Sequence, residues 1–226
     1  MRARDGRGND PYALQADTCA VLTRLPFGGA GRHNDRVTRV IAGSAGGRRL
    51  AVPPGRTTRP TSDRAREGIF ATVGSVLGPL DGLRVADLYA GSGAVGLEAL
   101  SRGAAHALLV ESDPKAVRTI RANVAALGLP GAVVVADRVE RVVAKDCAEP
   151  YHLVFLDPPY AMPGDEVTAV LAALRDHGWL APDALVAVER QSRDAPVMWP
   201  SGYEKDRVRR YGEASVWYGR AAGNHR

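Results

Sequence analysis

The sequence is poor in cysteine, in lysine and in long apolar runs. Its two cysteines, Cys19 and Cys147, stand far apart and outside any CxxC pattern. They predict neither a disulfide framework nor a thiolate metal site, and they suit a reducing cytoplasm. No stretch approaches the roughly 18 apolar residues of a membrane span, and the N-terminus lacks the apolar core of a secretory signal. We therefore expect a cytoplasmic protein without membrane contact and without a bound metal.

Several catalytic motifs are also missing. The chain has no GxSxG, no P-loop lysine and no HExxH, and its five histidines are scattered. These absences argue against α/β-hydrolases, P-loop nucleotide hydrolases and zinc proteases. The residues that remain as candidates for chemistry are carboxylates, glycines and arginines.

Basic residues are concentrated in one segment. Between Arg36 and Arg66 there are eight arginines and one acid, Asp63, so this segment carries +7 in a chain whose net charge is +5. A general preference for arginine over the three lysines does not explain why the excess lies in one place. A local basic face is typical of nucleic-acid binding, although a solvated face is the alternative. The predicted phosphate contacts are Arg39, Arg48, Arg49, Arg59 and Arg64.

We expect the chain to have three parts. Residues 1–36 mix glycine, arginine, aspartate and proline without periodicity, which predicts a disordered or irregular extension. A valine start codon at Val37 would remove this extension from the native protein. Residues 37–79 form a basic unit, in which 38–52 are expected to be a β-hairpin and a helix follows a proline-rich loop. Residues 80–226 form the main domain.

From Leu83 onward, apolar strand-like runs alternate with helical segments. The expected strands are 83–89, 107–112, 132–137, 152–157 and 184–190, and the expected helices are 94–102, 114–127, 138–146 and 165–177. Such alternation is typical of an α/β fold whose parallel sheet is covered by helices on both faces. The segments 203–212 and 214–220 are spaced like an antiparallel hairpin at the edge of that sheet.

A glycine-rich loop follows the first of these strands and opens a helix. It has the form Gly91-x-Gly93-x-x-Gly96, in which glycines let the chain turn sharply and let a ligand approach the backbone. The motif alone is a weak signal, and a nucleotide-binding oxidoreductase is the competing interpretation. The candidate cofactor-binding residues in this stretch are Asp87, Tyr89, Ala90, Gly91, Ser92, Gly93 and Gly96.

Three acids lie on or at the ends of consecutive strands beside this loop. Asp87 would attract a cationic or amine-bearing group and repel a pyrophosphate, Glu111 suits ribose hydroxyls, and Asp137 suits an adenine amino group. Structural alternatives exist, since Asp87 would also cap a loop and Asp137 a helix. Open α/β sheets bind ligands at the carboxyl ends of their strands, so the three acids together predict an adenosine with a cationic amino-acid end. S-adenosylmethionine meets that description, and we include Ser112 and Arg138 in its predicted site.

The fourth strand ends in Asp157-Pro158-Pro159-Tyr160 at the same predicted edge. An exocyclic amine of a base is a poor nucleophile because its lone pair is delocalised, and acceptors at Asp157 and the Pro158 carbonyl would favour the pyramidal nitrogen that attacks. The prolines hold those acceptors in place, and Tyr160 offers a face on which an extruded base can stack. A simple turn is the alternative. The predicted catalytic residues are Asp157, Pro158 and Tyr160, and Asp157 is also expected at the cofactor.

Together, DLYAGSGAVGLEALSRGA, the positions of Glu111 and Asp137, and FLDPPY resemble class I S-adenosylmethionine-dependent N-methyltransferases. The upstream RVIAGSAGGRRLAVPPGRTTRPTSDRAREGIF is similar to the bacterial 16S ribosomal RNA guanine-N2 methyltransferase family, and the resemblance covers nearly all of residues 37–220. It implies a Rossmann-like fold with a seven-stranded sheet, S-adenosylhomocysteine as product, and a monomer acting on 16S rRNA in an assembling or assembled small subunit. It also implies that Asp157 and Tyr160 hold the guanine.

Other functions are compatible with parts of the sequence. DPPY also occurs in N6-adenine and protein-glutamine methyltransferases, but a DNA-adenine enzyme needs a recognition domain and no segment is long enough. An oxidoreductase conflicts with Asp87 and DPPY, and a catalytically silent RNA-binding module conflicts with the intact glycine loop. The sequence also departs from the family pattern twice: residues 1–36 have no counterpart, and Ala71 stands where an asparagine is expected.

Overall fold

The structure is a computed structural model that describes residues 38–54 and 63–222. The predicted extension 1–36 and the predicted phosphate contact Arg59 lie outside these residues. The strands are β1 (Thr38–Arg39), β2 (Arg49–Leu50), β3 (Arg84–Leu88), β4 (His106–Glu111), β5 (Ala132–Ala136), β6 (Tyr151–Leu156), β7 (Leu180–Gln191), β8 (Tyr203–Tyr211) and β9 (Ala214–Ala221). The helices are α1 (Asp63–Leu77), α2 (Ala94–Ser101), α3 (Pro114–Leu127), α4 (Val139–Val143) and α5 (Gly164–Asp176).

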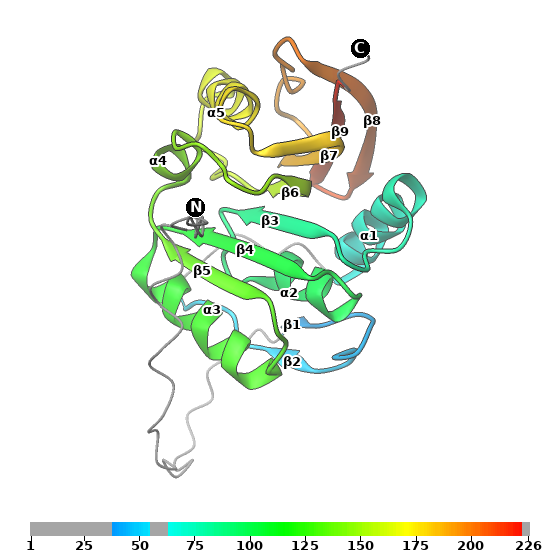
Figure 1. Ribbon diagram of the computed structural model, residues 1–226, viewed down its shortest axis with the longest axis vertical. Helices are drawn as coiled ribbons and strands as arrows, with labels where there is room; N and C mark the ends of the chain where they lie inside the picture. The colour runs from blue at the N-terminus through cyan, green and yellow to red at the C-terminus, as the bar shows by residue number, and fades with distance from the viewer. Residues whose placement is uncertain (1–37, 55–62, 223–226) are drawn as a thin grey trace, which may run out of the picture. The chain divides into compact units, whose positions relative to one another are not determined.

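Seven strands form one sheet in the order β5-β4-β3-β6-β7-β9-β8 (Figure 1). The first five are parallel to their neighbours, whereas β9 runs antiparallel to β7 and β8 antiparallel to β9. This confirms the predicted Rossmann-like sheet with its C-terminal hairpin. The strand order reverses between β3 and β6, and such a switch point is where open α/β sheets bind ligands.

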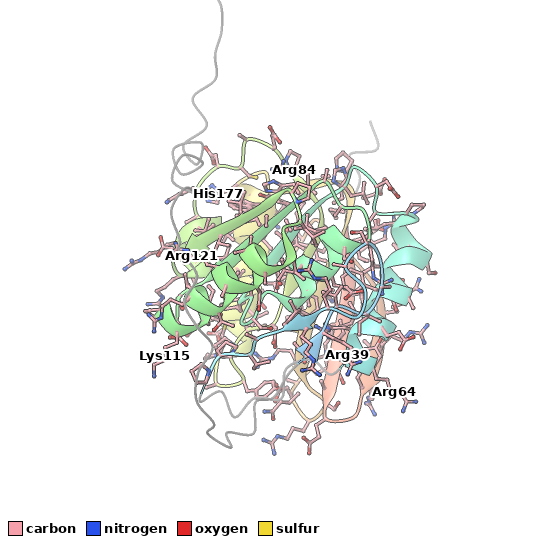
Figure 2. All side chains as sticks on the ribbon, turned by 90° about the horizontal axis from the view of Figure 1, so that it is seen from below. Arg39, Arg64, Arg84, Lys115, Arg121 and His177 are labelled. Carbon is pink, nitrogen blue, oxygen red and sulfur yellow. The ribbon has the colours of Figure 1, made fainter. Side chains whose placement is uncertain are left out.

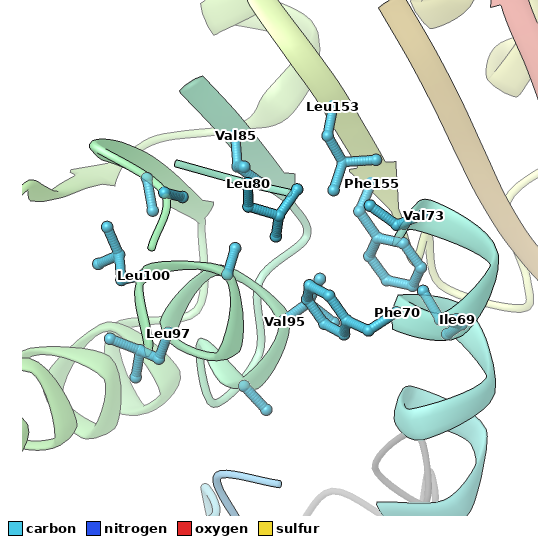
Figure 3. Packing of buried hydrophobic residues seen from close by; sticks show 14 of the residues in the cluster. Ile69, Phe70, Val73, Leu80, Val85, Val95, Leu97, Leu100, Leu153 and Phe155 are labelled. Atoms are coloured by element: carbon cyan, nitrogen blue, oxygen red, sulfur yellow. The ribbon is translucent and has the colours of Figure 1, made fainter. Parts of the chain in front are cut away.

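The central strands are buried on both faces because alternate residues supply two separate cores. On one face, Val85 of β3 and Phe155 of β6 pack with α1, α2 and α3 (Figure 3). On the other face, Leu88 and Leu156 of the same strands pack with α4 and α5. Successive side chains of a strand point to opposite faces, so two covered faces require the continuous apolar runs seen in the sequence.

The predicted N-terminal hairpin is present and packs on the sheet. Its strands β1 and β2 are two residues each and pair antiparallel, with Thr38 opposite Leu50. Leu50 is 1% exposed and belongs to the same core as Phe70 of α1 and Phe155 of β6. The described residues before and after position 80 therefore share one core. The predicted division at this position, between a basic unit and the main domain, concerns function and stays a prediction.

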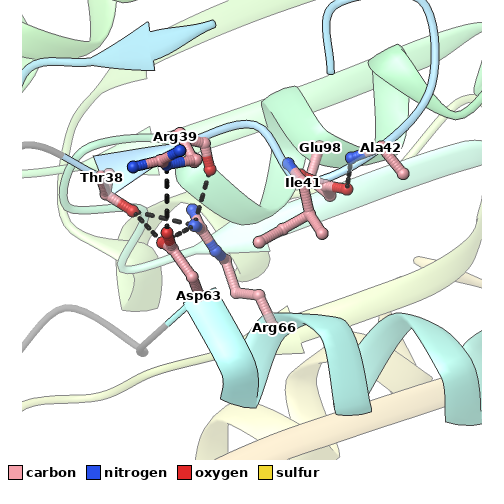
Figure 4. A network of polar contacts seen from close by, with 7 residues as sticks. All are labelled: Thr38, Arg39, Ile41, Ala42, Asp63, Arg66 and Glu98. Carbon is pink, nitrogen blue, oxygen red and sulfur yellow. Dashed lines mark hydrogen bonds and ion pairs between the residues drawn. The ribbon is translucent and has the colours of Figure 1, made fainter. Parts of the chain in front are cut away.

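A wholly buried carboxylate anchors this hairpin to α2. The Glu98 side chain is 0% exposed; its carboxylate accepts hydrogen bonds from the Ile41 N–H at 2.6 Å and the Ala42 N–H at 3.0 Å (Figure 4). It also accepts from Arg102 Nε at 2.7 Å. A buried charge is tolerated when its hydrogen bonds are satisfied, and here two of the donors are backbone groups of the hairpin.

A buried cation joins the hairpin to α1. Arg66 is 0% exposed, and its Nη2 donates to Thr38 Oγ1 and the Arg39 carbonyl, both at 2.8 Å, and to Asp63 Oδ1 at 2.6 Å (Figure 4). Burial lowers the pKa of Arg66, and the charge of Asp63 opposes that shift. One of the eight arginines counted in the basic segment is therefore structural.

The hairpin loop also lies directly against the end of α2. Gly43 has a φ of +81°, and a Cβ there would lie 1.8 Å from the Ser101 carbonyl oxygen. The Ser44 N–H donates to that oxygen at 2.7 Å, and the Ser101 hydroxyl donates to the Ala42 carbonyl at 2.6 Å. Only glycine permits so close a backbone approach with a positive φ.

Across residues 38–54 and 63–222, the helices are all too short or too polar to cross a membrane. The same ranges contain no cluster of three His, Cys, Asp or Glu side chains that could hold a metal ion.

Candidate functional site

The glycine-rich loop connects β3 to α2 at the carboxyl edge of the sheet. Tyr89, Gly91 and Gly93 have positive φ angles of 63°, 61° and 77°. A Cβ on either Gly93 or Gly96 would lie 2.9 Å from Cδ2 of Leu109 on β4. The glycines therefore let the loop turn and let α2 start directly against the sheet.

Asp87 lies beneath this loop and is 2% exposed. Its Oδ2 accepts a hydrogen bond from the Gly96 N–H at 2.9 Å. Burial raises the pKa of Asp87 to about 7; the hydrogen bond from Gly96 opposes that shift and the negative charge of Glu111 adds to it. A cation placed beside Asp87 would stabilise its charged form, so this position favours a positively charged ligand group.

Glu111, at the end of β4, is 5% exposed and orders the loop from the other side. Its Oε2 accepts from the Gly91 N–H at 2.9 Å, and its Oε1 accepts from the N–H groups of Ser112 and Asp113 at 2.8 and 2.9 Å. The sequence did not predict this role in shaping the loop. A contact to ribose hydroxyls stays a prediction.

The turn after β5 forms the far side of the site. Asp137 Oδ1 accepts from the Arg138 N–H at 2.8 Å and lies 3.7 Å from Arg141 Nη1. The expected alternative that Asp137 caps α4 is wrong, because Arg138 is the N-cap and no side chain caps this helix. The Tyr89 hydroxyl donates to Glu140 Oε1 at 3.0 Å. The Tyr89 side chain, which extends from the glycine loop, therefore reaches α4.

Asn123 of α3 is a buried residue of this region that sequence analysis missed. Its Nδ2 donates to the Ser92 carbonyl at 2.9 Å and to the Ala51 carbonyl at 3.0 Å, and its Oδ1 accepts from the Ala51 N–H at 2.9 Å. One amide thus joins the glycine loop to the segment that follows β2. A single asparagine in a helix gives no sequence signal for such a role.

The Asp157-Pro158-Pro159-Tyr160 corner lies beside the glycine loop because β6 is the parallel neighbour of β3. The Asp157 N–H donates to the Leu88 carbonyl of β3 at 3.3 Å. Pro158 is buried, whereas Asp157 and Tyr160 are half-buried. The two motifs that predicted a common site are therefore brought together at the switch point of the sheet.

Tyr160 opens onto a cavity of about 360 Å³. Its other lining residues are Gln191, Ser192, Arg193, Gly212 and Glu213. Burial raises the pKa of Tyr160, and the negative charges of Asp157, Glu189 and Glu213 add to the shift. These residues were missed because they match no motif. The only available signal was the predicted C-terminal hairpin, whose turn returns to the carboxyl edge of the sheet.

Arg48, a predicted phosphate contact, has a structural partner. Its Nη1 donates to the Leu127 carbonyl at 2.8 Å and its Nη2 to the Ala126 carbonyl, so it covers the C-terminal end of α3. Cations are favoured there by the helix dipole. Its contact with RNA stays a prediction.

The other described arginines of the predicted RNA face are exposed. Arg49 and Arg64 extend from β2 and α1, and the Arg39 side chain is 66% exposed, with Nε 3.7 Å from Asp63 Oδ2. In Figure 2, Arg39 and Arg64 project at the same corner of the view. Exposed guanidinium groups gathered in this way suit a phosphate backbone.

Replacing Asp87 by asparagine is expected to stabilise the ligand-free protein increasingly as the pH rises from 5 to 8. The pKa of Asp87 is raised from 3.8 to about 7, so between these values the folded state holds a proton that the unfolded state has released. The stability that Asp87 contributes is therefore complete below about pH 4 and is lost as the pH rises towards 7, by up to about 1.4 kcal/mol per pH unit.

Chemical denaturation of both proteins at pH 5 and pH 8 measures this difference. The gap in unfolding free energy between the two proteins reports the titration of Asp87 together with its coupling to Glu111 and Arg66. A gap of equal size at both pH values would contradict the prediction.

A family described as conserved hypothetical protein 95 matches residues 38–220. An Escherichia coli K12 protein called ribosomal RNA small subunit methyltransferase D is 39% identical over 171 residues, which are 74% of this chain and 83% of that protein. Its Haemophilus influenzae namesake is 32% identical over 168 residues, 73% of this chain and 84% of that protein. A solved Escherichia coli structure, described provisionally as a methyltransferase, has a TM-score of 0.71 and 34% identity and covers 83% of this chain and 99% of that one.

Proposed function

The chain belongs to the family described as conserved hypothetical protein 95, and from that premise we propose that it transfers a methyl group from S-adenosylmethionine to the N2 amine of a guanine in 16S rRNA. The observation that carries this proposal is the pairing of β3 with β6, because the glycine loop follows β3 and the Asp157-to-Tyr160 corner follows β6 at the same edge of the sheet. The relatives named as methyltransferases of small-subunit rRNA support the substrate class. The choice of guanine N2 is supported by the resemblance of the N-terminal segment.

The residues around the glycine loop fit S-adenosylmethionine. The buried carboxylate of Asp87 favours a cationic ligand group, whereas a dinucleotide would bring a pyrophosphate towards it. Glu111 suits the ribose hydroxyls of either ligand. Gly93 and Gly96 keep the loop free of side chains where it approaches β4. When bound, S-adenosylmethionine would supply the methyl group of its sulfonium and leave as S-adenosylhomocysteine. The proposed contacts are Asp87, Tyr89, Ala90, Gly91, Ser92, Gly93, Gly96, Glu111, Ser112, Asp137 and Arg138, with Asp157 as a minor contact whose main role is towards the guanine amine.

The Asp157-to-Tyr160 corner would activate and orient the guanine. The Asp157 carboxylate and the Pro158 carbonyl would each accept a hydrogen bond from one of the two N2–H groups. This would direct the nitrogen lone pair out of conjugation as the new N–C bond forms and the methyl–sulfur bond breaks. The N2 proton is then released to Asp157 or to water. Tyr160 stacks on the base, and the prolines keep these groups in place. Most of the rate gain then comes from alignment, which can supply about 7–11 kcal/mol.

Methyl transfer from tritiated S-adenosylmethionine, with nucleoside analysis of the product, tests this function. Deproteinised 16S rRNA and assembled small subunits are offered in parallel, because the preferred substrate reports whether ribosomal proteins form part of the recognised surface. We expect N2-methylguanosine in at least one sample. N6-methyladenosine, or no transfer to either substrate, would overturn the substrate assignment. Binding of NAD without binding of S-adenosylhomocysteine would favour the oxidoreductase alternative.

Replacing Arg64 by alanine is expected to weaken RNA binding and to flatten its salt dependence. Arg64 is exposed, and loss of one phosphate contact lowers the slope of log K against log salt by about 0.7–0.9. The melting temperature of Arg64→Ala should equal that of the parent protein. Filter binding of RNA at several salt concentrations between about 50 and 200 mM measures this slope.

Arg48→Ala is the matched control for this experiment. Because Arg48 is bonded to the end of α3, its loss should lower the melting temperature, and its salt slope reports whether the predicted phosphate contact is made as well. An unchanged slope for Arg64→Ala would remove that residue from the RNA interface, and a lowered slope for Arg48→Ala would give Arg48 both roles.

A further inference from the structure

The corner after β7 is joined to Met162 by a chain of polar contacts, and the Met162 N–H in turn donates to the Pro159 carbonyl of the Asp157-to-Tyr160 corner at 2.8 Å. Arg190 Nη2 donates to the Met162 carbonyl at 3.0 Å, and Arg190 Nε lies 3.3 Å from Asp194 Oδ2. That same oxygen accepts from the Gln191 N–H at 3.2 Å. Arg190 is 7% exposed, so the contacts are largely protected from water. The segment 191–194 is therefore held in a fixed position relative to the proposed catalytic loop.

The turn between β8 and β9 is fixed to the same corner. The Ser192 N–H donates to the Glu213 carbonyl at 2.8 Å, and the Ser192 hydroxyl donates to the Gly212 carbonyl at 3.2 Å. The Ser192 and Ser215 hydroxyls also lie 2.9 Å apart. Three segments distant in sequence thus form one wall around the cavity beside Tyr160.

The lining of this cavity offers both a cationic donor and an anionic acceptor. Arg193 Nε donates to Gln191 Oε1 at 2.7 Å, and an arginine held through Nε keeps both terminal amino groups for a ligand. Glu213 lines the cavity together with Arg193, and both lie at exposed positions on its rim. The volume of about 360 Å³ is within the range of about 300–1,000 Å³ that small-ligand pockets occupy.

We propose that this cavity reads the target guanine, with the Arg193 guanidinium donating to O6 and N7 and the Glu213 carboxylate accepting the N1–H. This rests on the proposed function. Arginine paired with O6 and N7 is the commonest specific contact to guanine in nucleic-acid recognition. Adenine would bring an amine in place of O6 towards Arg193 and a lone pair at N1 towards Glu213, so Arg193 would keep only N7 and the Glu213 contact would be lost. Tyr160 and Asp157 then hold the base for chemistry, and Arg193 and Glu213 determine which base is held.

The test uses small-subunit rRNA in which the methylated guanine is replaced by 2-aminopurine. This base keeps the exocyclic amine at C2 but lacks O6 and the N1–H. The parent protein should prefer guanine by roughly 10- to 100-fold in kcat/KM, as expected for one good bidentate contact. In Arg193→Ala and in Glu213→Gln this preference should fall to a few-fold. Arg193→Lys keeps the charge but not the planar guanidinium, so its preference for guanine should lie between those of the parent and Arg193→Ala.

The ratio of the two substrates separates recognition from a general effect. Guanine and 2-aminopurine differ in the intrinsic reactivity of their amines, but that difference is the same for every variant. Calorimetry with S-adenosylhomocysteine should give the parent affinity for all three variants, since both side chains lie on the exposed rim. A guanine preference that stays at the parent value in Arg193→Ala and Glu213→Gln, even with slower transfer, would overturn this inference. Failure of the parent protein to form N2-methylguanosine would instead overturn the proposed function.

Discussion

Asp157→Ala is expected to lower methyl transfer to 16S rRNA by at least about 100-fold, a typical loss when one preorganised polar contact to a reacting group is removed. Its affinity for S-adenosylhomocysteine should change little. The glycine loop is shaped by Asp87, Glu111 and the loop glycines, and none of these contacts requires the Asp157 carboxylate. Single-turnover transfer measures the first effect and isothermal calorimetry the second.

Two matched variants sharpen this experiment. Asp157→Asn keeps the size of the side chain and one acceptor oxygen, so its activity should fall between the parent and Asp157→Ala. Tyr160→Phe keeps the ring that stacks on the base and should retain most activity, whereas Tyr160→Ala should lose the roughly 1–3 kcal/mol of a base stack. If Asp157→Ala loses affinity for S-adenosylhomocysteine, the carboxylate holds the cofactor and not the amine.

Glu98→Ala is expected to destabilise the protein by about 3–5 kcal/mol, the usual effect of removing one partner of a buried charged group. It leaves the N–H groups of Ile41 and Ala42 and the Arg102 guanidinium without their acceptor, and it opens a cavity where the side chain was fully buried. At about 2–4 °C per kcal/mol for a chain of this size, the melting temperature should fall by roughly 6–20 °C.

Thermal and denaturant unfolding followed by circular dichroism measure this loss. Glu98→Gln keeps one acceptor and should be affected less. Glu67→Ala is the control, because Glu67 is an exposed glutamate on the neighbouring helix α1 and its replacement should cost no more than about 0.5 kcal/mol. Hydrogen exchange should accelerate at the Ile41 and Ala42 amides in Glu98→Ala. An equal melting temperature for Glu98→Ala and Glu67→Ala would show that the hairpin is not anchored through Glu98.

Elements whose ends have local causes could be predicted closely from sequence. Helix α3 runs from Pro114 to Leu127, as expected, because Asp113 accepts from the Lys115 N–H at its start and Gly128 takes the left-handed conformation at its end. Helix α4 ends at Val143, earlier than the expected 146. Its buried residues stop there, and residues 144–146 are exposed.

Features that depend on distant partners could not be predicted. A charge count treats all arginines alike, yet Arg66 is buried against β1 and Arg48 is bonded to α3. The motifs identified Asp87 and Asp157 because their spacing from the strands is characteristic. Arg193 and Glu213 belong to no motif, and only the pairing of β9 with β7 brings their segments to Tyr160.

A hairpin seated on α2 through Gly43 and Glu98 is held too firmly to swing over the sheet edge as a lid. Under the proposed function, a fixed hairpin leaves more of the shape change needed for catalysis to the RNA, whose target guanine must leave its stack at a cost of a few kcal/mol. That cost is least while the guanine is still unpaired. We therefore expect the enzyme to be selective for a stage in the maturation of the ribosome, with timing as much as sequence deciding which guanine is modified.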